Sequence, residues 1–224
     1  MENKKELYII GAGGFGRETA WLVDRINQRS PEWELKGFID REASEKEIFA
    51  KYKIIGGDEY LNTINHTIWI VCAIGSPLRR KKVIEQLKKN SYIRFATLVD
   101  PSVILSERVC IGEGCILCAG TVLTVDVTLG CHVIINLSCT VGHDTIIGDF
   151  VTVNPGTNLS GNVIVGAYTS LGTGMQVIQG RTIGEESIVG AGAVVVSDIP
   201  KNCTAVGIPA KPIKYFENRQ EHME

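Results

Sequence analysis

The chain has 224 residues and a net charge of −2, and 44% of its residues are hydrophobic against 21% that are charged. This composition excludes a disordered chain, and the near-neutral charge argues against a nucleic-acid-binding protein, because phosphate backbones select basic surfaces. No apolar run is long enough for a membrane-spanning helix, and the N-terminus lacks the apolar stretch of a signal peptide, so we expect a cytoplasmic protein without membrane insertion.

The first part of the chain alternates short apolar runs with helical spacing of apolar residues. These patterns predict, in chain order, a strand at 7–10, a helix at 18–26, strands at 35–39 and 68–74, and a helix from Pro77 to about residue 89. Such alternation is typical of parallel sheets built from βαβ units. We therefore expect a Rossmann-like α/β domain over residues 1–95.

The composition changes near residue 98. Eleven of the fifteen aromatic residues lie before residue 96, and only Phe150 and Tyr168 fall between residues 99 and 200. The same interval holds 11 charged residues, whereas residues 1–98 hold 30. The second part must therefore have an interior too narrow for large rings.

A six-residue repeat occupies this second part. Every sixth position from Val99 to Val195 is Val, Leu or Ile, and the series two positions earlier, from Thr97 to Ala193, is almost entirely small. An ordinary amphipathic strand does not alternate for so long without turn clusters. Residues 96–214 are therefore predicted to form a repetitive all-β domain, with a polar tail at 215–224.

Glycines recur once in every three of these repeats, at Gly112, Gly130, Gly148, Gly166 and Gly184. We expect tight corners at these glycines, because glycine tolerates backbone angles that other residues avoid. Three six-residue sides then make one triangular coil, and each strand pairs with its copy one coil away.

The seven cysteines carry no clear chemical signal. An odd number in a chain without an export signal indicates reduced thiols. Cys115 and Cys118 have the CxxC spacing, but no second pair and no histidine at ligand spacing accompany them, so we predict no metal site. Cys139 is disfavoured as an acyl-carrying nucleophile because it occupies an inward small-residue position.

A glycine motif follows the first predicted strand. Gly11, Gly13 and Gly16 have the GxGxxG spacing, and Asp40 ends the second predicted strand, where a ribose-binding acid would be expected. In isolation this pattern predicts NAD binding. A dehydrogenase is disfavoured because the predicted sheet has about half the strands that a dinucleotide needs. The remaining alternative is that the glycines serve only helix–strand packing.

His143 is the histidine best placed for catalysis. It follows the inward Val141 by two positions at a predicted corner, and Asp144 follows it. The repeat offers few other groups that titrate near pH 7, so we predict that His143 is a general base and that Asp144 orients its ring. Asp144 could instead be an ordinary surface carboxylate. Gly161, one coil further on, should stack on the same corner, where its N–H could stabilise an oxyanion.

Four segments together resemble bacterial nucleotide-sugar acetyltransferases of the hexapeptide-repeat type, a group that includes sialic-acid O-acetyltransferases and N-acetyltransferases of 4-amino-sugars. The segments are Gly11–Glu18, Ala73–Arg80, Asn136–Asp144 and Gly207–Lys211. The resemblance implies an α/β N-terminal Rossmann-like domain followed by an all-β left-handed parallel β-helix. It also implies acetyl-CoA as co-substrate and a homotrimer in which coenzyme A lies between neighbouring β-helices.

For the acceptor, the resemblance implies that the glycine loop and Asp40 hold a nucleotide-sugar, with the loop at the diphosphate. The loop residues are Gly11, Gly13, Gly14 and Gly16. Gly75 and Arg80 lie at the carboxyl end of a predicted strand, where open parallel sheets bind ligands, and Arg79 and Arg80 could neutralise phosphate. A merely solvated basic helix is the alternative. Asn136 could touch the sugar, although a corner ladder with Asn154 is favoured.

For the acyl donor, the resemblance places a glycine amide, here Gly161, at the thioester carbonyl. Some relatives carry a second histidine nine residues after the first, and this chain has Thr152 there, which leaves the thioester contacts in doubt. Lys201, Lys211 and Lys214 are the candidates for the 3′-phosphate of coenzyme A.

We thus predict N-acetylation of a nucleotide-linked 4-amino-sugar by direct transfer, in surface-glycan biosynthesis. O-acetylation of sialic acid or another sugar is the alternative. A non-catalytic β-helix scaffold and an NAD-dependent oxidoreductase are more distant alternatives.

Overall fold

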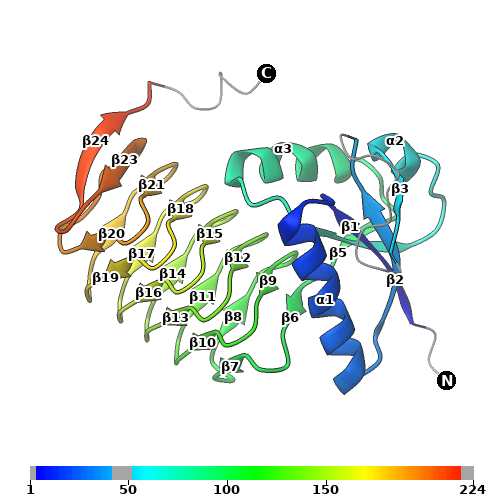
Figure 1. The fold of residues 1–224 in the computed structure, drawn as a ribbon, viewed down its shortest axis with the longest axis horizontal. Coiled ribbons are helices and arrows are strands. Elements are labelled where there is room, and N and C mark those ends of the chain that lie inside the picture. Colours follow the sequence, from blue (N-terminus) through cyan, green and yellow to red (C-terminus); the bar gives the residue numbers. More distant parts are fainter. Residues whose placement is uncertain (1–3, 42–51, 218–224) are drawn as a thin grey trace.

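The computed structural model describes residues 4–41 and 52–217. Within these residues it contains a five-stranded α/β part and a parallel β-helix, packed side by side, with the hairpin of the last two strands at the far end of the β-helix (Figure 1). Both predicted architectures are confirmed. The left-handed twist stays an implication of the family resemblance.

The α/β part is a fully parallel sheet with the strand order β3-β2-β1-β4-β5. Its elements are β1 (Lys5–Ile10), α1 (Gly14–Arg29), β2 (Trp33–Ile39), β3 (Ile54–Gly56), α2 (Asp58–Leu61), β4 (Ile68–Cys72), α3 (Pro77–Leu87) and β5 (Ile93–Phe95). Strands β3 and β5 were not predicted, because three residues are too few to show a periodicity. Helix α1 begins four residues before the predicted start, because its first turn is a glycine-rich segment without apolar spacing.

Alternating side chains of β1 supply the two faces of this sheet. Leu7 and Ile9 pack with Ala20 and Val23 of α1 on one face. On the other face, Tyr8 and Ile10 pack in a cluster that contains Ile84 and Leu87 of α3. Burial on both faces explains why β1 and β4 are continuous apolar runs.

In the described part of the chain, the β-helix is built from seventeen strands of two residues each, closed by a longer hairpin. The short strands are β6 (Leu98–Val99), β7 (Ile104–Leu105), β8 (Cys110–Ile111), β9 (Ile116–Leu117), β10 (Val122–Leu123), β11 (Thr128–Leu129), β12 (Ile134–Ile135), β13 (Thr140–Val141), β14 (Ile146–Ile147), β15 (Thr152–Val153), β16 (Asn158–Leu159), β17 (Ile164–Val165), β18 (Ser170–Leu171), β19 (Gln176–Val177), β20 (Thr182–Ile183), β21 (Ile188–Val189) and β22 (Val194–Val195). The hairpin is β23 (Cys203–Val206) and β24 (Lys211–Tyr215), and the last residues of the predicted tail, 218–224, lie outside the described residues.

Three sheets, parallel apart from the final β23–β24 pair, form the faces of the prism, and they are numbered here in the chain order of their first strands. The first face runs from β6 through β9, β12, β15, β18 and β21 to β23 and β24, the second from β7 to β22, and the third from β8 to β20. Each strand pairs with its copy three repeats away, as Leu123 does with Val141. The predicted coil of three repeats is therefore confirmed.

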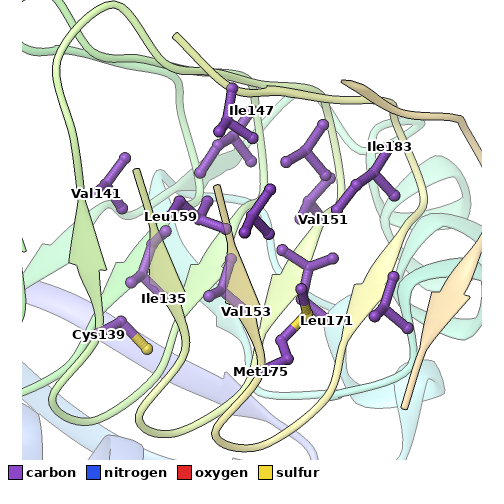
Figure 2. Close-up of a cluster of buried hydrophobic side chains, with 14 of the residues drawn as sticks. Ile135, Cys139, Val141, Ile147, Val151, Val153, Leu159, Leu171, Met175 and Ile183 are labelled. Carbon is purple, nitrogen blue, oxygen red and sulfur yellow. The ribbon is translucent and has the colours of Figure 1, made fainter. Parts of the chain in front are cut away.

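The interior of the prism is the predicted aliphatic series. Ile135, Val141, Val153 and Leu171 point inward and are at most 1% exposed (Figure 2). Leu105 departs from the pattern and is 39% exposed, because it lies in the first coil and no earlier coil covers it.

The small-residue series does more than fill space. Buried Thr and Cys side chains of this series donate hydrogen bonds to backbone carbonyls in the following coil. Each of these carbonyls belongs to a corner residue. The donors and acceptors are Thr121 to Asn136, Thr145 to Ser160, Thr157 to Gly172, Thr169 to Gly184, Cys115 to Gly130 and Cys139 to Asn154. These bonds satisfy carbonyl groups that the two-residue strands leave unpaired.

The glycines that recur once per coil do not adopt backbone angles that other residues avoid, so the predicted reason for them is wrong. None of the five has a positive φ; the left-handed positions are instead every sixth residue from Gly114 to Gly192, with φ between 55 and 74°. A β-carbon at Gly112 would lie 2.6 Å from the carbonyl carbon of Gly130, and one at Gly148 would lie 2.7 Å from the nitrogen of Ala167. These glycines therefore allow successive coils to stack closely.

The α/β part packs on the first face of the β-helix. Leu98, Ile116 and Ile134 of that face join the cluster that contains Ala20 and Val23 of α1. Beside them, Arg25 of α1 forms a two-pronged ion pair with the buried Asp100, at 2.6 and 3.0 Å. The two parts thus share one apolar core and one charge-assisted contact.

A row of rings continues this interface along the corner between the third and first faces. Phe95 meets His132 edge-on at 5.0 Å, His132 stacks on Phe150 at 4.9 Å, and Phe150 stacks on Tyr168 at 5.7 Å. These rings lie outside the prism, so the interior is as narrow as predicted. The His132 ring is buried, and no described group makes a hydrogen bond with its Nε2.

The buried His132 should make the free energy of unfolding depend on pH. Burial, reinforced by Lys88 and Arg80 and opposed by Asp149, lowers the pKa of His132 from 6.5 to about 4. The unfolded chain therefore binds a proton between these pH values while the folded chain does not. The free energy of unfolding should fall by about 3 kcal/mol as the pH drops from 7 to 4.

Denaturant titrations at several pH values check this expectation, with His132→Asn as the comparison, because asparagine tolerates the left-handed backbone of this position. In the variant, the free energy of unfolding should fall less steeply between pH 6.5 and 4 than in the wild type. If the two proteins show the same slope of unfolding free energy against pH, His132 does not cause this dependence.

Candidate active site

The carboxyl edge of the parallel sheet opens into a cleft of about 940 Å³. Gly11, Gly13 and Asp40 line it on one side, and Arg79 and Lys82 of α3 on the other. The Asp40 carboxylate accepts a hydrogen bond from the Ala12 N–H at 2.8 Å. The structure therefore brings together the glycine loop and the acid that lie at the ends of different strands.

The glycines of this loop have different roles. Gly13 and Gly14 are exposed at the start of α1, and no atom lies within 4 Å of a β-carbon at either position. No side chain caps this helix, so its first N–H groups are available to an anion in the cleft. Gly16 is buried, and a β-carbon there would collide with the Gly11 carbonyl. Gly16 therefore serves helix–loop packing, and its assignment to the ligand stays a prediction.

Arg80 also departs from its predicted role. Its side chain is completely buried, and its Nε donates to the His132 carbonyl at 3.0 Å while Nη2 donates to the Phe150 carbonyl at 2.6 Å. It therefore cannot reach a phosphate in the cleft. Arg79 and Lys82 of the same helix are exposed and line the cleft, as Arg41 does, and helical spacing in α3 explains the difference from Arg80.

Thr152 also makes its contacts within the chain. It is 3% exposed, and its hydroxyl donates to the Gly75 carbonyl at 2.7 Å. Gly75 itself lies exposed in the loop between β4 and α3, at the edge of the cleft. The side chain is buried between the two parts of the chain, which argues against a contact with acyl-coenzyme A, and that assignment stays a prediction.

His143 lies at the corner between the second and third faces, after β13 and before β14. Its ring is 49% exposed, and Nδ1 lies 2.7 Å from Oδ2 of Asp144. In the neutral ring Nδ1 donates its proton to this carboxylate, because a carboxylate only accepts hydrogen bonds, and Nε2 then presents its lone pair. Asp144 occupies a left-handed position with φ of 58°, which directs its side chain back to the ring. This pair can remove a proton from a bound nucleophile.

Gly161 lies one coil above His143, as the three-repeat period predicts. A β-carbon at Gly161 would lie 2.5 Å from Cε1 and 2.7 Å from Cδ2 of His143. The imidazole therefore occupies the space that the absent side chain leaves. No described group accepts a hydrogen bond from the Gly161 N–H, so this donor is available beside the base.

Within one chain, His143 and the cleft lie on different sides of the β-helix. The α/β part packs on the first face, whereas His143 stands at the corner opposite that face. No hydrogen bond or ion pair between described residues joins His143 to the cleft. The residues that the sequence assigned to catalysis and those that it assigned to the acceptor are therefore apart within one copy of the chain.

The remaining predicted contacts are dispersed. Asn136 is half-buried at the corner between the first and second faces and accepts a hydrogen bond from the Leu137 N–H, as a corner residue does. Lys201 lies 3.9 Å from Glu185, and Lys211 and Lys214 lie on β24. Their assignments to sugar and coenzyme A stay predictions.

Other chemistry has little support in the described residues. Burial raises the pKa of the Cys139 thiol to about 11, so it is a poor nucleophile at neutral pH. Within residues 4–41 and 52–217, no three His, Cys, Asp or Glu side chains are grouped to hold a metal ion. No helix in these residues is both long and apolar enough to cross a membrane.

Comparison with known proteins places this geometry in a family. Residues 6–87 match a family model described as the PglD N-terminal domain, and a search of curated proteins finds no match. The acetyltransferase domain of PglB from Neisseria gonorrhoeae is 31% identical, with a TM-score of 0.86 over 94% of this chain and 100% of that one. The chain belongs to the bacterial hexapeptide-repeat nucleotide-sugar acetyltransferases.

Further structures agree with this membership. PerB from Caulobacter crescentus, solved with CoA and GDP-perosamine, is 29% identical, with a TM-score of 0.83 over 96% of this acetyltransferase and 99% of PerB. WeeI from Acinetobacter baumannii is 28% identical, with a TM-score of 0.84 over 94% and 100% of the two chains. The predicted enzyme class, an acetyl-CoA-dependent acetyltransferase, is confirmed, and the scaffold and oxidoreductase alternatives are set aside.

Proposed function

We propose that this enzyme N-acetylates a nucleotide-linked 4-amino-sugar, with His143 as general base, in surface-glycan biosynthesis. The observation that supports this most is the His143–Asp144 pair stacked on Gly161. The comparison with PerB supports the acceptor class, because that relative is solved with CoA and a nucleotide-linked amino-sugar.

In this proposal the cleft of the α/β part holds the nucleotide. The diphosphate lies against Gly13, Gly14 and the first N–H groups of α1, and Arg79 and Lys82 neutralise its charge. Asp40 lies beside the nucleoside and also fixes the loop through Ala12. The sugar then extends out of the cleft towards a β-helix corner.

The reaction is a direct transfer. The 4-amino nitrogen attacks the thioester carbonyl of acetyl-CoA, and Nε2 of His143 takes the proton that the nitrogen loses. In this proposal the Gly161 N–H donates a hydrogen bond to the oxyanion that develops on the carbonyl. The tetrahedral intermediate then collapses, the C–S bond breaks, and the coenzyme A thiolate leaves and takes up the proton. Asp144 stabilises the imidazolium between these steps.

We further infer that a second copy of the chain completes the site, in agreement with the homotrimer that the resemblance implies. His143 and the cleft of one chain face different directions, so the acceptor must reach the His143 of a neighbour. The His143 corner carries exposed aliphatic side chains suited to such contact, namely Val125, Ile146 and Ile164.

The test is acetyl transfer by the purified enzyme with acetyl-CoA and a panel of UDP-, GDP-, CMP- and dTDP-linked 4-amino-sugars, with free sialic acid and matching 4-hydroxy-sugars as controls. We expect release of free thiol and an N-acetylated product with at least one amino-sugar. Acetylation of sialic acid or a hydroxy-sugar alone, or no transfer to any acceptor, would refute the proposal.

A further inference from the structure

Arg80 of α3 is a buried cation that forms an ion pair with no carboxylate of the described residues. Its guanidinium donates only to oxygens of the protein itself. The acceptors are the carbonyls of Ile74 (2.6 Å), Gly75 (3.2 Å), His132 (3.0 Å), Phe150 (2.6 Å) and Val151 (3.2 Å), and the hydroxyl of Thr152 (3.0 Å). Burial lowers the pKa of Arg80 to about 10, which still leaves it charged at neutral pH.

These acceptors come from three segments far apart in the sequence. Ile74 and Gly75 belong to the loop between β4 and α3, His132 lies at a corner of one coil, and Phe150 to Thr152 lie at the same corner of the next coil. The Thr152 hydroxyl, which accepts from Arg80, donates in turn to Gly75 at 2.7 Å. Arg80 and Thr152 therefore attach the loop to two coils at once.

The attached loop is also a wall of the acceptor cleft. Ala73 and Ile74 line the cleft, and so do Arg79 and Lys82, whose side chains leave α3 in other directions than the buried Arg80. A shift of this loop on the β-helix would therefore move the groups that face the nucleotide. Burying a guanidinium is costly unless all its donors are satisfied. An apolar side chain would suffice if this position only had to pack α3 against the β-helix.

We propose that Arg80 and Thr152 are positioning residues, which fix the acceptor cleft on the β-helix so that the bound sugar reaches the catalytic imidazole. This proposal rests on the proposed function. It assigns to Thr152 a role on the acceptor side of the reaction.

The test compares Thr152→Val with Thr152→Ser. Valine keeps the shape and removes the hydroxyl, whereas serine keeps the hydroxyl. We expect the valine variant to lose roughly tenfold in kcat/KM for the acceptor while its KM for acetyl-CoA stays within about twofold of wild type. The serine variant should retain near-wild-type values for both substrates.

Thr169→Val is the matched control, because Thr169 is also buried and donates its hydroxyl to a glycine carbonyl, that of Gly184 at 3.0 Å, away from the cleft. Its Tm should fall by as much as that of Thr152→Val, with unchanged acceptor kinetics. Unchanged acceptor kinetics in Thr152→Val, or an equal loss in Thr169→Val, would overturn the proposal.

Two further measurements keep the test decisive. The lysine in Arg80→Lys cannot reach all six oxygens, so if this variant folds it should lose more kcat/KM for the acceptor than Thr152→Val. Adding Thr152→Val to Arg80→Lys should then lower kcat/KM little further, because both residues act through the same contacts. Amide hydrogen exchange of residues 73–80 should be faster in the valine than in the serine variant. Equal exchange in both variants contradicts the proposal without reference to activity, whereas a wild-type enzyme inactive on every amino-sugar refutes the proposed function instead.

Discussion

Replacing His143 by alanine should lower kcat by about a hundred- to ten-thousand-fold, because the acceptor amine then loses its proton without a positioned base. The KM or Kd for acetyl-CoA should change little, since the imidazole is assigned to the acceptor's proton. Steady-state kinetics and calorimetric titration with acetyl-CoA measure the two quantities separately.

His66→Ala is the control for this change, because His66 is an exposed histidine that also lies near a carboxylate, Glu6, at 3.3 Å. It should keep wild-type activity. Near-normal turnover in His143→Ala would remove the base from the mechanism. Loss of acetyl-CoA binding together with turnover would mean that His143 holds the donor instead.

Replacing Gly161 by alanine should lower kcat by roughly a hundredfold, because the new methyl group would push the imidazole away from its stacked position. The atoms nearest to this methyl group belong to the His143 ring, a side chain that can rotate, so the fold should survive. The expected signature is low kcat with a Tm close to that of wild type.

Gly166→Ala provides the contrast. A β-carbon at Gly166 would lie 2.7 Å from the Cα of Glu185 in the next coil, and backbone cannot rotate aside. This variant should lose Tm and keep its activity per folded molecule. If Gly161→Ala keeps full activity, the stacking of His143 on Gly161 has no catalytic role, and if it loses Tm like Gly166→Ala, the His143 ring does not rotate aside as expected.

Long periodicities made most of the fold predictable. The aliphatic series from Val99 to Val195 specifies the prism interior because every coil repeats the same geometry. The strands Ile54–Gly56 and Ile93–Phe95 were missed because each is held by pairing with a neighbouring strand, and its own three residues show no pattern. The corner glycines were identified correctly and explained wrongly, since a sequence shows where glycine occurs and not which atom stands beside it.

The stacking of Gly161 beside His143 was predictable from their spacing, because the two residues are one coil apart. The surroundings of adjacent residues in a helix were not predictable. Arg79 and Arg80 are adjacent cations in the sequence, and only the rotation of α3 sends one to the cleft and buries the other. The contact of Thr152 was not predicted, because its partner, Gly75, comes from the other part of the chain.

The central claim is that the His143 of one copy serves the acceptor held by another. Subunit complementation tests it most directly, by mixing His143→Ala chains with chains that carry Arg79→Glu and Lys82→Glu, which repel a diphosphate. Each variant alone should be nearly inactive, and oligomers reassembled from both should recover a substantial fraction of wild-type acetyl transfer. If mixed oligomers form and activity stays at the level of the separate variants, the base and the acceptor do not come from different copies, and the account is contradicted.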